Sequence, residues 1–177
     1  LEAAIELAEA GRMSCAPNPT VGCIITRSGD IIGRGFHRRA GEAHAEVEAI
    51  ADAGGDVAGA TVYVSLEPCS FEGRTPACAQ TLIDHAVSRV VVGTVDPNPR
   101  VAGAGVNMLQ QAGVRVDVVD LPSAARSIAG FAKRMGTGLP WVRLKSAASL
   151  DGALALASGE SKWLTGTLAR QDVQYWR

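Results

Sequence analysis

The chain has 177 residues, of which 47% are apolar and 20% are charged, and its formal net charge is −1. This composition is typical of a globular protein and not of a disordered one. No run of Lys or Arg stands out, which argues against a nucleic-acid partner but allows one small phosphorylated ligand. Since the sequence contains neither a run of about eighteen apolar residues nor a signal peptide, we expect no membrane span and a cytoplasmic location.

The first elements predicted are a helix and a hairpin. Residues 1–11 have the apolar spacing of an amphipathic helix, and Gly11 suits its end. Two prolines within 15–20 favour an extended loop. The apolar runs 21–26 and 31–35 flank a Ser-Gly-Asp turn and therefore predict the two strands of a hairpin.

Helices and strands then alternate. The apolar segments 61–66, 89–94 and 114–119 predict buried strands, and helices are predicted at 43–53, 76–85 and 105–112. This order predicts an α/β fold in three α/β/α layers, with helices covering a mixed, mostly parallel sheet. We expect this first domain to span residues 1–121.

The remainder is predicted to contain a connection and a fragment. A helix is expected over 122–135, within a connecting segment of residues 122–139, followed by a strand at 141–148 and a helix at 167–176. Residues 140–177 are too few to form an independent core. We therefore interpret them as the N-terminal fragment of a second domain.

Three short motifs are candidates for chemistry: His44-Ala45-Glu46, Glu67-Pro68-Cys69, and Cys78. Catalytic zinc is bound by three nitrogen and sulfur ligands and keeps one position for water, whose pKa the metal lowers. His44, Cys69 and Cys78 supply such a set for one zinc ion per chain. Glu46 would then move protons between that water and a leaving amine.

Helix geometry tests this assignment. Residues two apart in a helix interior point to nearly opposite sides, so His44 and Glu46 can share a site only if His44 lies at or before the helix start. Glu48, four residues after His44, is the alternative proton carrier. Cys78 is expected in the first turn of its helix, where the helix dipole favours a thiolate.

Other interpretations concern the cysteines. Buried cysteines are common in cores, and Cys23, within an apolar run, fits that description. A structural zinc site would recruit Cys15 or Cys23 as a fourth ligand and would leave Glu46 without a task. The combination of His-x-Glu with Pro-Cys and a later Cys matches the zinc deaminase signature. One departure is the spacing, since residues 70–77 separate Cys69 from Cys78 where the signature has two residues.

Longer motifs resemble one family, the deaminase part of the bifunctional riboflavin biosynthesis deaminase-reductases, in which the long cysteine spacing is usual. The resemblance covers 1–121 and implies a cytidine-deaminase-like fold. Residues 144–152 and 158–166 resemble the start of the family's reductase domain, which has a dihydrofolate-reductase-like fold and uses NADPH. We expect no reductase activity from this polypeptide. The matching stretches are 17–23, 33–37, 44–46, 66–70, 73–78 and 96–99.

The resemblance implies a substrate, 2,5-diamino-6-ribosylamino-4(3H)-pyrimidinone 5′-phosphate, deaminated hydrolytically at the carbon that bears the 2-amino group. Asn18 and His37 are candidates for base or ribose contacts, and Arg74 for the phosphate or the ribose. The loop departs from the family pattern at Phe71 and Glu72. Alternative substrates are cytidine, guanine or a tRNA adenosine. The resemblance also implies a homo-oligomer, either a dimer or a tetramer.

Overall fold

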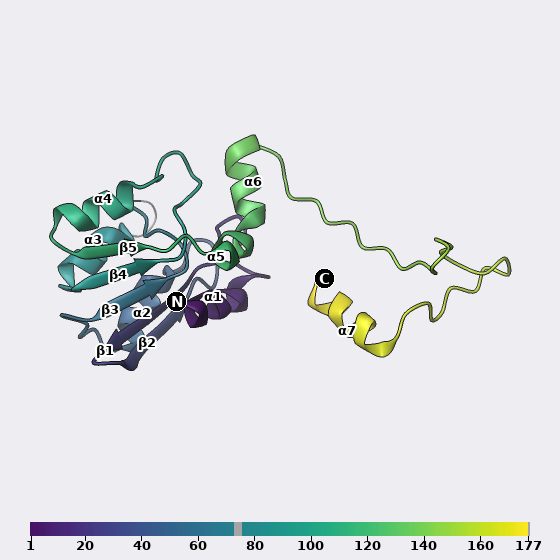
Figure 1. Cartoon of the computed structure of the whole chain (residues 1–177), viewed down its shortest axis with the longest axis horizontal. Coiled ribbons are helices and arrows are strands. Elements are labelled where there is room, and N and C mark those ends of the chain that lie inside the picture. Colours follow the sequence, from purple (N-terminus) through teal and green to yellow (C-terminus); the bar gives the residue numbers. More distant parts are fainter. Residues whose placement is uncertain (73–75, 177) are drawn as a thin grey trace. The chain divides into compact units, whose positions relative to one another are not determined.

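The computed structural model describes residues 1–72 and 76–176. The chain divides into two compact units, Leu1–Trp141 and Val142–Arg177. The first holds the sheet and all but one of the described helices (Figure 1).

A five-stranded sheet forms the centre of the first unit, in the order β2-β1-β3-β4-β5. β1 is antiparallel to both β2 and β3, whereas β3, β4 and β5 are parallel. The expected mixed sheet is confirmed, but parallel and antiparallel pairs are equally numerous because β1 lies between its hairpin partner and β3. The strands are β1 (Gly22–Arg27), β2 (Asp30–Phe36), β3 (Thr61–Val64), β4 (Arg89–Val92) and β5 (Arg115–Val118).

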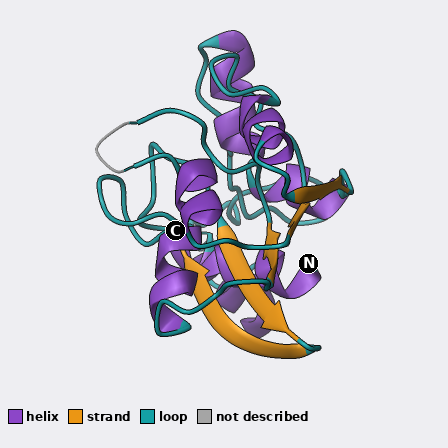
Figure 2. Ribbon diagram, turned by 90° about the vertical axis from the view of Figure 1, so that its left-hand side faces the viewer, coloured by secondary structure: helices purple, strands orange, loops and turns teal. Residues whose placement is uncertain are grey.

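Helices cover both faces of the sheet, as the three-layer prediction requires (Figure 2). α1 and α5 contact each other on one face, while α2 contacts β1, β2 and α3, and α3 contacts α4. The backbone of β1 at Gly22 approaches α1, and that of β2 at Gly35 approaches α2. The helices are α1 (Glu2–Ala8), α2 (Ala45–Asp52), α3 (Cys78–Asp84), α4 (Ala104–Gln111), α5 (Pro122–Ser127) and α6 (Ala129–Thr137), with a short 3-10 helix at Glu9–Gly11.

Valines of the central strands and apolar residues of the covering helices form the core. Val62, Val64, Val90 and Val92 are all 0% exposed. Burying each such side chain stabilises the fold by roughly 1.5–3 kcal/mol. Val64 at the end of β3, Ala45 in the first turn of α2 and Ala79 in the first turn of α3 belong to the same core cluster, and the candidate site residues lie close to them in the sequence.

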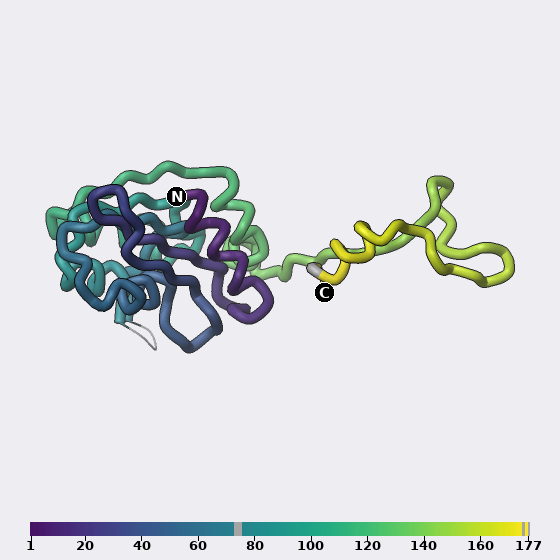
Figure 3. The backbone as a smooth tube through the Cα atoms, turned by 90° about the horizontal axis from the view of Figure 1, so that it is seen from below, coloured from purple at the N-terminus to yellow at the C-terminus, as the bar shows by residue number. Residues whose placement is uncertain are grey.

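Two predicted elements differ from the structure. The predicted helix 122–135 is divided at Ile128, whose φ of −106° and ψ of 13° interrupt the helix between α5 and α6. The strand predicted at 141–148 is wrong. A strand needs a partner to complete its hydrogen bonds, and the described part of Val142–Arg177 contains one regular element, helix α7 (Thr167–Tyr175), in an otherwise irregular path (Figure 3). That helix was predicted.

Among the described helices, none combines the length and the apolar character needed to cross a bilayer.

Candidate metal centre and adjoining cavity

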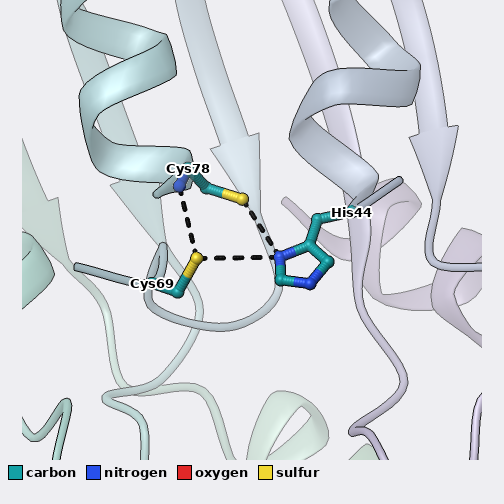
Figure 4. Close-up of side chains that lie close together, drawn as sticks. All are labelled: His44, Cys69 and Cys78. Carbon is teal, nitrogen blue, oxygen red and sulfur yellow. Dashed lines mark hydrogen bonds between the residues drawn. The ribbon is translucent and has the colours of Figure 1, made fainter. Parts of the chain in front are cut away.

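Three separate segments bring the predicted ligands together (Figure 4). His44 is the N-cap of α2, and its backbone is extended, with φ −78° and ψ 165°. It therefore lies at the start of the helix and outside its regular turns, as expected. Cys69 lies in the loop after β3, and Cys78 is the first residue of α3.

The donor atoms have the spacing of a tetrahedral zinc site. The ligand atoms of His44, Cys69 and Cys78 lie within 4.8 Å of one another. His44 Nδ1 is 3.2 Å from Cys78 Sγ and 3.6 Å from Cys69 Sγ. Zinc bonds of about 2.3 Å to thiolate and about 2.0 Å to imidazole place tetrahedral donors roughly 3.5–3.8 Å apart. One nitrogen and two sulfurs therefore fit zinc both in chemistry and in size.

The surroundings of Cys69 favour its thiolate. Hydrogen bonding with Cys78 and with His44 lowers the pKa of Cys69 to about 4. The backbone N–H of Cys78, at the start of α3, donates to Cys69 Sγ over 3.2 Å. The same pairing raises the pKa of Cys78, because one proton is shared between the two sulfurs. A bound cation would replace that proton.

Glu46 is the buried acid beside these ligands. It occupies the first turn of α2, is 3% exposed and lines the same cavity as His44 and Cys69. Burial, together with the negative charge of Cys69, raises the pKa of Glu46 to about 7. The alternative proton carrier, Glu48, instead forms an ion pair with Arg38 over 3.2 Å.

A cavity of about 500 Å³ adjoins the three-ligand cluster. Its wall comes from the loop before β1, the segment between β2 and α2, the ends of β3 and β4, and helix α6. Its volume lies within the range typical of small-molecule sites. Its lining includes Asn18, His37, Glu67, Asp96, Asn98 and Phe131.

Asn18 and His37 are hydrogen-bonded to each other in the cavity wall. Burial lowers the pKa of His37, which is 2% exposed. His37 Nδ1 lies 3.0 Å from the carbonyl oxygen of Ala43, so Nδ1 carries the proton and donates. The other nitrogen, Nε2, then accepts from Asn18 Nδ2 at 2.9 Å. Asn18 therefore keeps its Oδ1 for a ligand, while both nitrogens of His37 are engaged.

The remaining predicted residues have different outcomes. Arg74 lies outside the described residues. Cys15 and Cys23 are buried and free, and neither belongs to the cluster of His44, Cys69 and Cys78. Cys23 is instead part of the main apolar core, as its sequence context indicated.

Sequence reasoning assigned no role to several residues of the cavity, among them Glu67, Asp96, Asn98 and Phe131. Glu67, Asp96 and Asn98 occur in the matching motifs, but no role was derived for them. A usable signal existed, because polar residues that follow buried parallel strands gather at one edge of a sheet. Phe131, on the predicted connecting helix, carries no such signal.

The motifs, the three-layer fold and the three-ligand cluster are together typical of the zinc-binding deaminase family. Residues 1–94 match the family model of the cytidine and deoxycytidylate deaminase zinc-binding region. The chain belongs to this family. A second model, the RibD C-terminal domain, matches residues 140–177, which supports the interpretation of the tail as the start of a reductase domain.

Over nearly its whole length the chain is similar to riboflavin biosynthesis proteins. RibD of Escherichia coli (strain K12) is 54% identical over 98% of this chain and 48% of its own length. The RibD structure from Acinetobacter baumannii is 54% identical, with a TM-score of 0.88 over 99% of this chain and 50% of that one.

A third relative is the Thermotoga maritima protein described as diaminohydroxyphosphoribosylaminopyrimidine deaminase/5-amino-6-(5-phosphoribosylamino)uracil reductase. It is 40% identical, with a TM-score of 0.93 over 99% of this chain and 51% of that one. The family resemblance and the cytidine-deaminase-like fold are confirmed. The chain spans about half the length of these relatives.

Proposed function

We propose that this chain hydrolytically deaminates 2,5-diamino-6-ribosylamino-4(3H)-pyrimidinone 5′-phosphate to the corresponding pyrimidinedione. The observation that carries the proposal is the meeting of His44, Cys69 and Cys78 beside the buried carboxyl group of Glu46 at one cavity. The similarity to RibD proteins supports the choice of substrate.

The proposed roles follow from the donor set. His44, Cys69 and Cys78 would hold one zinc ion, which when bound would act as a Lewis acid and make water a nucleophile near neutral pH. Glu46 takes the two protons of the attacking water in turn and transfers one to the ring nitrogen and the other to the departing amine. The water oxygen bonds to the ring carbon, the carbon–nitrogen bond to the 2-amino group breaks, and ammonia leaves.

Asn18 and His37 are proposed to orient the substrate. The Oδ1 atom of Asn18 accepts a hydrogen bond from the base or the ribose. His37 acts through Asn18, because its two ring nitrogens are engaged by Ala43 and by the Asn18 amide. This modifies the expectation of direct substrate contact by His37. We propose Arg74, from the loop between the two cysteines, for the phosphate.

We propose that residues 1–121 form the deaminase domain, 122–139 the connection and 140–177 the N-terminal fragment of a reductase domain. Thr20 Oγ1 donates to the carbonyl oxygen of Ser127 over 2.9 Å, which ties the connection to the deaminase domain. NADPH would serve only a complete reductase domain. We further propose a homo-oligomer and a cytoplasmic site of action, where the four free cysteines stay reduced.

The test measures ammonia release from this substrate by the zinc-loaded chain and by Glu46→Gln. Removing a general acid and base typically costs about 10²- to 10⁴-fold in rate. Glu48→Gln is the matched control, because it changes a neighbouring carboxylate that pairs with Arg38. We expect a large loss for Glu46→Gln and nearly full activity for Glu48→Gln. Release of ammonia from deoxycytidylate but not from the diaminopyrimidinone would contradict the proposed substrate.

A further inference from the structure

Glu67 is a buried acid that no step of the proposed reaction uses. It is 3% exposed and stands two residues before the ligand Cys69. Its carboxyl group accepts four backbone hydrogen bonds. Oε2 accepts from Asp96 N at 3.1 Å and Gly103 N at 2.9 Å, and Oε1 accepts from Gly105 N at 2.9 Å and Val106 N at 3.2 Å.

All four donors belong to one segment, the chain between the end of β4 and the first turn of α4. The N-terminal amides of a helix need acceptors, which an N-cap side chain commonly supplies. The N-cap of α4 is Gly103, which has no side chain. Glu67 supplies the acceptor from a different part of the chain, and its negative charge suits the positive end of the helix dipole.

The same segment builds part of the cavity wall. Asp96, Asn98 and Val101 line the cavity, and Asp96 Oδ1 accepts from the backbone N–H of Asn98 at 2.8 Å. The segment also touches the ligand loop directly. A Cβ placed on Gly105 would lie 1.9 Å from the carbonyl oxygen of Pro68, so only glycine permits this approach.

We propose that Glu67 is a positioning residue that holds the 96–106 segment against the Pro68-Cys69 loop and thereby sets the substrate-binding wall relative to the metal centre. Its effect on activity rests on the proposed function. Its effect on the segment does not, because that effect follows from the four hydrogen bonds alone.

Glu67→Gln is the sharpest perturbation because glutamine has nearly the same shape. Its carbonyl oxygen can still accept, but its NH₂ group must face two backbone N–H donors and cannot accept from them. A buried donor left without a partner costs as much as a lost hydrogen bond. The segment should therefore loosen, whichever way the amide is turned.

The matched control is Thr94→Val. Thr94 is buried at the end of β4, and its Oγ1 donates to Asp120 Oδ1 over 3.0 Å. This variant also removes a hydrogen bond near the same segment, but it leaves intact the backbone hydrogen bond from Glu67 N to the carbonyl oxygen of Thr94, and Thr94 does not line the cavity. It separates general destabilisation from loss of positioning.

Hydrogen exchange and steady-state kinetics test the proposal together. For Glu67→Gln we expect amide protection in 96–106 to fall about tenfold or more, with other segments unchanged. We also expect KM to rise about tenfold, kcat to change much less, and zinc content to stay at that of the wild type. Thr94→Val should leave protection in 96–106 and KM unchanged.

Wild-type exchange in 96–106 for Glu67→Gln, or a loss no greater than that of Thr94→Val, would overturn the inference. If Glu67→Gln does not fold, Glu67→Asp replaces it, because the shorter side chain withdraws both oxygens and should give the same local loss. If the wild-type chain releases no ammonia, the proposed function fails, and the exchange measurement alone decides the role of Glu67.

Discussion

The close packing of α2 on β2 predicts a sharp functional effect for Gly35→Ala. A Cβ on Gly35 would lie 2.2 Å from the carbonyl oxygen of Ala45 and 2.4 Å from the backbone nitrogen of Ala49, whereas ordinary contacts begin at 3.4 Å. Both atoms are backbone, so the start of α2 must move by about 1 Å to relieve the overlap. Ala45 stands between His44 and Glu46, and the movement therefore displaces the proposed metal ligand and the proposed proton carrier together.

The magnitude follows from that displacement. Misplacing catalytic groups by about 1 Å costs on the order of 10²-fold in rate, and overpacking costs about 1–3 kcal/mol of stability. We expect kcat/KM for ammonia release to fall about 100-fold, with a lower melting temperature. The assay measures initial rates after zinc content has been matched between the proteins.

Gly136→Ala is the control for this prediction. Gly136 lies in α6, and a Cβ there meets no heavy atom within 4 Å. It should leave kcat/KM unchanged and raise the stability of the helix by up to about 1 kcal/mol. Wild-type kcat/KM in the Gly35→Ala protein would contradict this prediction, because the overlap would then be relieved without moving the site.

Three further predictions concern the metal and the cavity. Removing the metal with a chelator should abolish ammonia release and lower the melting temperature, and added zinc should restore both. Activity that survives complete removal of the metal would contradict its proposed role. Cys23→Ser should keep one zinc per chain but lower stability by about 1–3 kcal/mol, since Cys23 is 0% exposed in the core; loss of zinc, read by elemental analysis, would favour a four-ligand structural site. Phe131→Ala should raise KM about tenfold with kcat little changed, because Phe131 lines the cavity beside Arg134; an unchanged KM would remove α6 from the substrate-binding wall.

Local sequence patterns predicted much of the fold. The apolar runs around the Ser-Gly-Asp turn predicted β1 and β2, and the alternation that follows predicted the remaining strands and their helices. The pairing of the strands was harder to predict, because apolar runs do not show which strands lie next to β1 in the sheet. The strand expected at 141–148 has the apolar character of a strand, but a strand also requires a partner, which no local pattern supplies.

The candidate site was likewise predicted only in part from the sequence. His44, Cys69 and Cys78 were selected by residue type, and the position of His44 at the start of α2 followed from helix geometry. The hydrogen bonds of His37 could not be predicted, because they depend on Asn18 and Ala43 meeting in three dimensions.

Hydrolytic removal of the 2-amino group transfers an oxygen atom from water to the ring carbon. The most direct test supplies the zinc-loaded chain with the diaminopyrimidinone ribosylamino phosphate in water labelled with oxygen-18, and analyses the product by mass spectrometry. We expect one labelled oxygen on the ring carbon for each ammonia released, and none with Glu46→Gln. Ammonia without labelled oxygen in the product, or equal labelling by Glu46→Gln, would contradict it.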